Sequence, residues 1–278
     1  MTDAYGWTGK NRRVQRILHS ASGTTFLVPL DHSLADGPVA SAAGFAGLVE
    51  AMAANEVDGI IVHKGRVRFL PTASLGRLAL IVHLNGSTQH APDVDAKILV
   101  GAVEEAVALG ADGVSVHINL GSSTESAQLT DLGAVAASCA HWGVPLLAMV
   151  YPRGPRIDDP KDPALLAHAA NVAADLGADI VKLPFTGSAL TMREVVEASP
   201  IPVVTAGGGV LDAGTFLDLI DSVMESGVLG VAVGRNIFQA PDPGWLARSV
   251  ARRVHAGPRS LETETLAGLG EEFSEATL

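Results

Sequence analysis

The sequence predicts an α/β protein in which eight parallel strands close into a single (β/α)8, or TIM, barrel. About eight short β-branched runs alternate with alanine-rich segments of helical periodicity, a pattern typical of a parallel sheet with crossover helices. Eight is the strand number that closes such a barrel. The doubly wound open sheet is less favoured, because no Gly-x-Gly-x-x-Gly follows the first strand, which runs instead into Pro29-Leu30-Asp31-His32.

A weak internal repeat marks the joints between helices and strands. In each copy a helical segment ends at Gly or another small residue, and Asp or Gly then precedes a β-branched run. The four copies begin at Val57, Gly110, Gly177 and Gly227. Glycine after a helix adopts the left-handed conformation at little cost, and a continuous apolar run is typical of a strand buried on both faces. Each copy therefore predicts a helix-to-strand joint.

The apolar runs and helical patterns place the elements in order. We expect strands at about 26–31, 59–63, 78–84, 113–118, 145–151, 180–184, 202–206 and 230–233. We expect helices at 42–54, 96–109, 129–141, 163–176, 192–198, 213–226 and 245–254. Residues 10–18 predict a short amphipathic helix that covers the N-terminal end of the barrel, and residues 259–278 predict an acidic C-terminal tail. The 278 residues are expected to form one domain, 1–278, with the barrel at about 24–256.

Charge and composition exclude several classes of function. The chain has 19 Lys and Arg against 30 Asp and Glu, a formal net charge of −11, which argues against binding to nucleic acid or to an anionic membrane. The single cysteine, Cys139, rules out an internal disulfide framework and fits a reduced, cytoplasmic setting. We expect neither a signal peptide nor a membrane-spanning segment, since no apolar stretch is long enough.

In a barrel enzyme the active site is built at the C-terminal ends of the strands, and here those ends are rich in ionisable groups. In chain order they carry Asp31-His32, His63-Lys64, His83, His117, Tyr151 and Arg153, Lys182, Gly207-Gly208-Gly209 and Gly234-Arg235. Strand ends are wetter than strand centres, so some of these groups, above all the three histidines His63, His83 and His117, can instead be satisfied by structural neighbours. The density of ionisable side chains still favours a catalytic site.

Lys182 is the sharpest candidate, because it interrupts the apolar run Ile180-Val181-Lys182-Leu183. Burial of an ammonium among apolar side chains favours the neutral amine, which is the nucleophile that forms a Schiff base with a carbonyl substrate. The structural alternative is a lysine that extends to the rim or pairs with Asp31. Asp31 and Tyr151 are candidates for the proton transfers of such chemistry, although Asp31 could be a buried structural acid and Tyr151 a core aromatic.

Two glycine turns predict a phosphate site. Gly207-Gly208-Gly209 and Gly234-Arg235 follow the last two strands, where barrels often bind phosphate through backbone N–H groups. Arg235 adds a charge-assisted hydrogen-bonding fork, although a lone glycine run can also be an ordinary loop. Three further residues are expected to contact substrate: His32, Arg153 and Lys64, the last as either a substrate or an ion-pair residue. No cluster has the spacing of a metal site and no serine lies in a nucleophile elbow, so neither a metal nor another cofactor is expected.

At these positions the chain resembles the archaeal-type class I aldolases, a branch of the deoxyribose-phosphate-aldolase-like barrels. The resemblance spans about residues 12–254 and is carried by the stretches 28–32, 62–65, 148–154, 178–182 and 230–239. It implies Lys182 as the Schiff-base lysine, Tyr151 as the proton-transfer residue and Asp31 as its acid–base partner. It also implies that the two glycine turns form the phosphate cradle, and that the chain forms a homo-oligomer, expected to be a ring-based decamer.

Within that family the chain is most similar to the aminoheptulosonate synthases and their actinomycete relatives. This likeness implies an aldolase that joins dihydroxyacetone phosphate to L-aspartate 4-semialdehyde, giving a phosphorylated C7 amino-keto acid for an aminohydroxybenzoate-type secondary-metabolite pathway. Residues 207–210 are Gly-Gly-Gly-Val where the archaeal pattern commonly has Gly-Gly-Pro-Lys, which puts the archaeal donor, a deoxyketohexose phosphate, in doubt. The alternatives are a transaldolase that uses that donor, a fructose-bisphosphate aldolase, a coenzyme A-dependent thiolase and a non-catalytic sugar-phosphate sensor.

Overall fold

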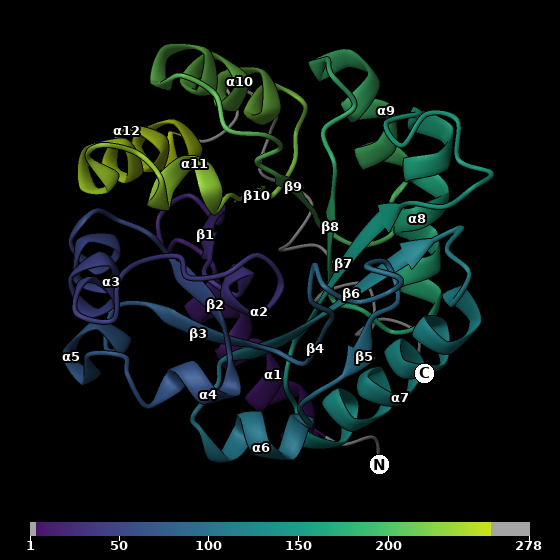
Figure 1. Ribbon diagram of the computed structural model, residues 1–278, viewed down its shortest axis with the longest axis horizontal. Helices are drawn as coiled ribbons and strands as arrows, with labels where there is room; N and C mark the ends of the chain where they lie inside the picture. Colours follow the sequence, from purple (N-terminus) through teal and green to yellow (C-terminus); the bar gives the residue numbers. More distant parts are fainter. Residues whose placement is uncertain (1–3, 257–278) are drawn as a thin grey trace, which may run out of the picture.

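The computed structural model describes residues 4–256, with side chains from Thr8 onward. Eight parallel strands close into a barrel in the order β1-β10-β9-β8-β7-β6-β3-β2 (Figure 1). They are β1 (Thr25–Pro29), β2 (Gly59–His63), β3 (Ala79–His83), β6 (Gly113–Leu120), β7 (Leu146–Pro152), β8 (Ile180–Leu183), β9 (Val203–Ala206) and β10 (Gly230–Ala232). The predicted TIM barrel is confirmed. The predicted acidic tail lies outside the described residues.

Helices surround the barrel (Figure 1). The longer ones are α3 (Gly44–Ala54), α6 (Val103–Ala108), α7 (Glu125–Trp142), α8 (Pro163–Asp175), α9 (Ala189–Ala198), α10 (Ala213–Glu225) and α12 (Pro243–His255), and the single-turn ones are α2 (His32–Ala35), α4 (Lys64–Val67), α5 (Thr72–Leu75) and α11 (Arg235–Phe238). Asp162, Ser188, Asp212 and Asp242 cap α8, α9, α10 and α12 by accepting a hydrogen bond from a backbone N–H of the first turn. No helix in the described part of the chain is long and apolar enough to cross a membrane.

The predicted helix at 96–109 is wrong over its first half. β4 (Asn85–Gly86) and β5 (Ile98–Leu99) form a small antiparallel pair there, and α6 begins only at Val103. The carbonyl of Leu84 accepts hydrogen bonds from the N–H groups of Val100 (2.7 Å) and Gly101 (3.0 Å), which ties this segment back to the end of β3. Contacts with residues distant in the sequence therefore override a local helical pattern.

The aspartates of the internal repeat have a structural role that explains why they recur. Each accepts a hydrogen bond from a backbone N–H of the neighbouring strand: Asp58 from Phe26 (2.7 Å), Asp112 from Leu80 (2.9 Å) and Asp179 from Leu146 (2.8 Å). In all three cases the donor lies one residue before the first residue that its strand pairs with the strand following the aspartate. The carboxylate thus satisfies an N–H group that the sheet register leaves without a strand partner.

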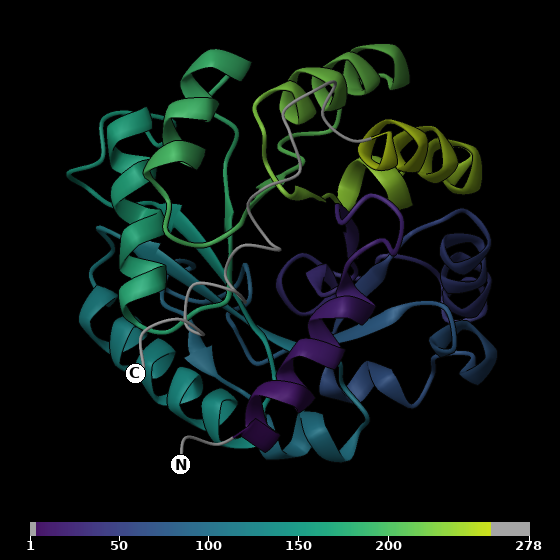
Figure 2. The same cartoon turned by 180° about the vertical axis from the view of Figure 1, so that it is seen from behind.

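Helix α1 (Ala4–Ile17) covers the N-terminal end of the barrel, as predicted (Figure 2). Lys10 Nζ and Arg16 Nε each lie 2.7 Å from a carboxylate oxygen, of Asp179 and Asp112 respectively. Ile17, at the end of the helix, is buried with the inward-facing side chains of the barrel. The basic face of the helix therefore pairs with two of the joint aspartates.

The third joint aspartate, Asp58, faces a histidine. Its Oδ2 lies 3.4 Å from Nε2 of His255, and the His255 ring stacks on that of His19 with 3.9 Å between centroids. Burial raises the pKa of Asp58 to about 7, the hydrogen bond from Phe26 opposes the rise, and the charge of Glu56 adds to it. The folded protein therefore binds a proton at Asp58 more tightly than the unfolded chain does.

We expect this carboxyl group to make the free energy of unfolding fall as the pH rises from about 4 to about 7, by about 1.4 kcal/mol per unit of pKa difference. In that range the unfolded chain releases the proton and folded Asp58 keeps it. Denaturant unfolding at several pH values should show a shallower decline for Asp58→Asn. Asp112→Asn is the comparison variant, because it removes the carboxylate of an equivalent joint: it should lose stability through the broken contact with Arg16 Nε at 2.7 Å. An unchanged slope in Asp58→Asn would contradict the prediction.

Candidate active site

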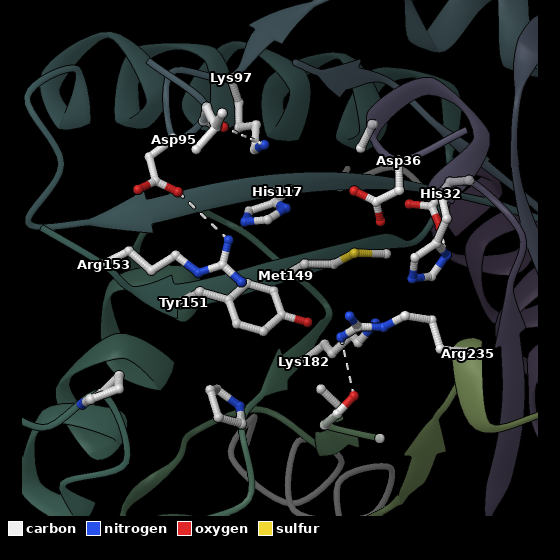
Figure 3. A pocket seen from close by; sticks show the side chains of 18 of the residues that line it. His32, Asp36, Asp95, Lys97, His117, Met149, Tyr151, Arg153, Lys182 and Arg235 are labelled. Atoms are coloured by element: carbon white, nitrogen blue, oxygen red, sulfur yellow. Dashed lines mark hydrogen bonds and ion pairs between the residues drawn. The ribbon is translucent and has the colours of Figure 1, made fainter. Parts of the chain in front are cut away.

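A cavity of about 1060 Å³ opens at the C-terminal ends of the barrel strands (Figure 3). Its wall contains eight of the ten predicted site residues: Asp31, His32, Tyr151, Arg153, Lys182, Gly207, Gly208 and Arg235. Lys64 and Gly234 do not line it. The wall also includes the strand-end histidines His63, His83 and His117, and four charged residues that the sequence analysis left unassigned: Asp36, Asp95, Lys97 and, at the exposed rim, Lys161.

The two-residue period of the strands explains why these side chains meet. Alternate residues of a strand point to the same side, and Leu27, Ile81, Met149 and Ile180 face the barrel interior. Asp31, His83, Tyr151 and Lys182 follow them on the same face, two or four residues further along their strands or just beyond. The barrel therefore directs the four side chains toward one another at its mouth.

Lys182 lies in β8 with 6% of its surface exposed. Its neighbours Val181 and Leu183 pack on the opposite face, in the core between strands and helices, and Lys182 pairs in register with Met149 of β7. The amine therefore ends in the cavity, which argues against a lysine that extends to the rim. No ion pair among the described residues joins Lys182 to Asp31, so the second structural alternative also lacks support.

Asp31 follows β1 and is surrounded by basic groups. Its carboxylate oxygens lie 3.5 Å from Nδ1 of His32 and 3.8 Å from Nε2 of His83. Burial alone would raise the pKa of Asp31, but the electrostatic influence of the nearby basic groups His83, His32 and Lys182 lowers it below its ordinary value. The carboxylate is therefore ionised at neutral pH and can accept a proton from a bound substrate.

The three strand-end histidines are kept neutral by burial. Burial lowers the pKa of His83 to about 4, that of His117 well below its ordinary value, and that of His63 as well. A neighbour orients each ring: Ser115 Oγ lies 2.8 Å from His83 Nδ1, Asn119 Oδ1 lies 2.8 Å from His117 Nε2, and the carbonyl of His83 lies 3.2 Å from His63 Nδ1. The contact with Ser115 leaves Nε2 of His83 facing Asp31, a geometry that favours a positioning role for this histidine, whose role the sequence analysis left open.

Tyr151 and Arg153 lie on the interior face of β7 and of the segment that follows it. The Tyr151 ring centroid lies 4.8 Å from that of His117, and the guanidinium carbon of Arg153 lies 4.9 Å from the Tyr151 centroid. Figure 3 shows the Tyr151 hydroxyl directed toward the part of the cavity where Lys182 lies. Packing by the two neighbours fixes the ring, and the hydroxyl is the part of the side chain that can reach a substrate.

The glycine turn after β9 is held by side chains from α11, which follows β10. Arg235 Nη2 donates to the carbonyl of Gly208 (3.1 Å), and Asn236 Nδ2 donates to the carbonyls of Gly207 (3.1 Å) and Gly209 (2.9 Å). Gly208 has a φ of +67°, a conformation that favours glycine. Engaging the three carbonyl oxygens reduces the negative potential that the turn presents to an anion, which favours phosphate binding.

Gly234 has a packing role instead of a place in the cavity wall. A Cβ at this position would lie 2.6 Å from the carbonyl oxygen of Pro29 and 2.8 Å from the ring of His32. The glycine therefore lets β10 approach the end of β1 and seats His32, whose ring also packs against Phe238. Asn236, which the sequence analysis did not assign, organises the glycine turn. The sequence feature that could have identified it is its position directly after Gly234-Arg235.

A sequence model of the DeoC/LacD family aldolases matches residues 25–240, from the first barrel strand to beyond the last. The chain belongs to the DeoC/LacD family of aldolases. A 2-amino-4,5-dihydroxy-6-oxo-7-(phosphonooxy)heptanoate synthase of Streptomyces griseus is 51% identical to it over 247 residues, which is 88% of this chain and 90% of the relative. The 2-amino-3,7-dideoxy-D-threo-hept-6-ulosonate synthase 1 of Archaeoglobus fulgidus is 40% identical, with 89% and 91% covered.

Solved structures agree with this family. An archaeal fructose 1,6-bisphosphate aldolase has a TM-score of 0.81 and 30% identity to this DeoC/LacD aldolase, over 89% of this chain and 100% of its own. A Schiff-base-forming fructose-1,6-bisphosphate aldolase also has a TM-score of 0.81, at 29% identity and with 88% and 99% covered. The protein is an enzyme of the class I, Schiff-base-forming type, and the predicted family resemblance is confirmed.

Lys64 lies outside the cavity of this aldolase. α4 begins at Lys64 directly after β2, and the ammonium lies 2.8 Å from a carboxylate oxygen of Glu105 in α6. Of the two roles that the sequence left open, this geometry favours the ion pair. Within residues 4–256, no group of three or more histidine, cysteine, aspartate or glutamate side chains could hold a metal ion.

Proposed function

We propose that this DeoC/LacD aldolase joins dihydroxyacetone phosphate to L-aspartate 4-semialdehyde and releases 2-amino-4,5-dihydroxy-6-oxo-7-(phosphonooxy)heptanoate. The synthase of Streptomyces griseus that is 51% identical carries this product in its name. In an aldol product, the new bond joins the carbon beside the ketone to the carbon that bears the new hydroxyl group, here C5 and C4. Cleaving that bond on paper gives a three-carbon phosphorylated ketone and a four-carbon amino-acid aldehyde, which are the two proposed substrates.

The proposed chemistry begins at Lys182. Its amine adds to the ketone carbon of dihydroxyacetone phosphate, and the carbinolamine loses water to give an iminium ion. The iminium accepts the electron pair released when a proton leaves the hydroxymethyl carbon, and the resulting enamine attacks the aldehyde carbon of the acceptor. Water then hydrolyses the iminium and frees both the product and the amine. We assign the proton transfers to Tyr151 and Asp31, which line the same cavity.

Arg235 is expected to hold the donor phosphate together with the turn at Gly207-Gly208. Arg235→Gln removes charge-assisted hydrogen bonds and should raise the KM for dihydroxyacetone phosphate about 10- to 100-fold, with a smaller change in kcat. The matched control is Arg252→Gln on the exposed side of α12, which should keep wild-type constants in the same steady-state assay. An unchanged KM in Arg235→Gln would mean that the phosphate binds elsewhere.

The decisive experiment concerns the donor. Purified enzyme is given aspartate 4-semialdehyde with either dihydroxyacetone phosphate or a deoxyketohexose phosphate, and the product is identified by mass. A phosphorylated C7 product from dihydroxyacetone phosphate supports the proposal. A C7 product that forms only from the deoxyketohexose phosphate and lacks phosphate would instead indicate the activity named for the Archaeoglobus fulgidus relative.

We further propose that the whole chain acts as one catalytic domain in the cytoplasm and assembles into a homo-oligomer, a ring-based decamer. Family membership supports the assembly, and the single, buried Cys139 supports the reduced compartment. Sedimentation velocity of the purified enzyme tests the assembly: a monomer at micromolar concentration would contradict it.

A further inference from the structure

The cavity has a second charged end, away from the glycine turn. Asp95, Lys97 and Arg153 line it, and Asp36, which also lines the cavity, lies beside His32 (Figure 3). Figure 3 shows Arg235 approaching Lys182 from one side and Arg153 lying on the other, with Tyr151 between Arg153 and Lys182. A three-carbon donor held at Arg235 and Lys182 therefore leaves the end at Arg153 for the acceptor aldehyde.

The segment that supplies Asp95 and Lys97 is anchored to the barrel. Nδ2 of Asn119 and Nε2 of Gln128 donate to the backbone carbonyl of Asp95, at 2.8 and 2.9 Å. Asn119 and Gln128 are both buried, at 0% and 1% exposed. These hydrogen bonds fix the backbone at Asp95, so the segment that carries Asp95 and Lys97 is held against the barrel before a ligand arrives.

Lys97 reaches this end with spare hydrogen-bonding capacity. Within the described chain its ammonium donates to two neutral oxygens, Ser87 Oγ at 2.6 Å and the carbonyl of Val94 at 2.8 Å. An ammonium has three N–H donors, so a third remains for a ligand. Burial, followed by the charge of Arg153, lowers the pKa of Lys97, and nearby carboxylates offset this only in part. An anion placed between Lys97 and Arg153 would offset both the burial of the ammonium group and its repulsion by Arg153.

Arg153 is similarly under-used. Its Nη1 lies 3.6 Å from Oδ1 of Asp95, a distance beyond that of a good charge-assisted hydrogen bond, and a guanidinium has five N–H donors. His117 lies beside the two cations (Figure 3), and burial, with the charge of Lys97 next in size, keeps it neutral by lowering its pKa. Positive charge at this end therefore comes from Lys97 and Arg153.

We propose that Lys97 and Arg153 bind the α-carboxylate of the acceptor aldehyde and that Asp36 binds its ammonium group. The inference rests on the proposed function, because it takes the acceptor to be an α-amino-acid aldehyde. Asp36 is exposed to the cavity, whereas Asp95 already faces Arg153. Two cations match a carboxylate and a carboxylate matches an ammonium, so this end of the cavity selects the zwitterionic aldehyde over an uncharged one.

Three acceptors separate the contacts. Aspartate 4-semialdehyde has both charged groups, succinic semialdehyde lacks the amino group, and butanal lacks both. With saturating dihydroxyacetone phosphate, wild-type kcat/KM is expected to fall in that order. Lys97→Met should lower kcat/KM for the two carboxylated acceptors about 10- to 100-fold and leave butanal unchanged, whereas Lys97→Arg should keep the wild-type preference. Asp36→Asn should reduce only the ratio between the first two acceptors.

A control variant and a trapping experiment separate this inference from the proposed function. Arg77→Gln, just before β3 at the opposite end of the barrel, should match wild type with every acceptor. Borohydride with dihydroxyacetone phosphate alone should add the donor mass to the Lys182 peptide in wild type and in each variant. Absence of that adduct in wild type would contradict the proposed function itself.

Other outcomes concern the acceptor end alone. If Lys97→Met and Asp36→Asn are trapped normally and keep the wild-type acceptor preference, the inference is overturned and the proposed function stands. A wild-type enzyme that forms the adduct but does not prefer aspartate 4-semialdehyde to butanal also overturns it. Normal trapping shows that a variant is folded. If Lys97→Met does not form the borohydride-trapped adduct, Arg153→Gln is compared in its place. A lower kcat/KM for the two carboxylated acceptors then supports the inference, and an unchanged acceptor preference overturns it.

Discussion

Lys182→Met is expected to abolish the aldol reaction, lowering kcat by about four orders of magnitude or more. Without the amine no iminium forms, and the donor carbon has no electron sink. Methionine is similar in length and apolar, and it fits the surroundings of a side chain that is 6% exposed and paired with Met149. The loss should therefore appear without loss of the fold, as measured by the midpoint of thermal unfolding alongside the steady-state rate.

Lys161 is the matched control for this experiment, because it also lines the cavity but is exposed on the rim. Lys161→Met should keep the wild-type rate. After borohydride treatment with dihydroxyacetone phosphate, peptide mapping should find the adduct at Lys182 and not at Lys161. A folded Lys182→Met enzyme that retains substantial activity would contradict a Schiff-base mechanism through this residue.

Lys182 could be predicted from the sequence because strand periodicity is local. A charged residue at an inward position of a β-branched run has to face the barrel interior. Asp31 and Tyr151 occupy inward positions by the same two-residue alternation, so they face the interior too. The joint aspartates were visible as a repeat for a related reason: the same register offset recurs between neighbouring strands, so the same hydrogen bond recurs.

Other parts of the site depend on contacts between residues far apart in the sequence. Residues 96–101 have a helical pattern, but hydrogen bonds to Leu84 hold this segment at the end of β3, where Lys97 lines the cavity. The sequence analysis therefore assigned Lys97 to a helix and not to the site. Lys64 and Gly234 follow strands as cavity residues do. The immediate start of α4 turns Lys64 toward Glu105, and the approach of His32 requires glycine at 234. None of these outcomes is encoded in the spacing of residues along the chain.

Asp31→Asn is expected to lower kcat by about 10²- to 10⁴-fold, the range of general acid–base catalysis. Asparagine keeps the size of the side chain and removes the negative charge that faces His32, His83 and Lys182. Proton transfers that form and dehydrate the carbinolamine should then slow, so the adduct trapped by borohydride should accumulate more slowly than in wild type. Rapid-quench trapping of the Lys182 adduct measures this step directly.

The pH dependence distinguishes a catalytic charge from a structural one. The neighbouring basic groups outweigh burial and lower the pKa of Asp31, so the carboxylate is ionised throughout the range from about pH 5 to 8. Asp31→Asn should therefore reduce kcat by a similar factor across that range.

The lowered pKa of Asp31 also stabilises the fold above the ordinary pKa of 3.8, and this contribution is lost as the pH falls through the lowered value. Asp31→Asn should thus unfold at a lower temperature than wild type at neutral pH. Ser115→Ala removes the hydroxyl that lies 2.8 Å from His83 Nδ1, and it should lower kcat less than Asp31→Asn does. If Asp31→Asn lost rate only on the acid side of the pH profile, the catalytic carboxylate would be a different residue. Asp31 stays ionised across that range, so its removal cannot produce a loss limited to one side.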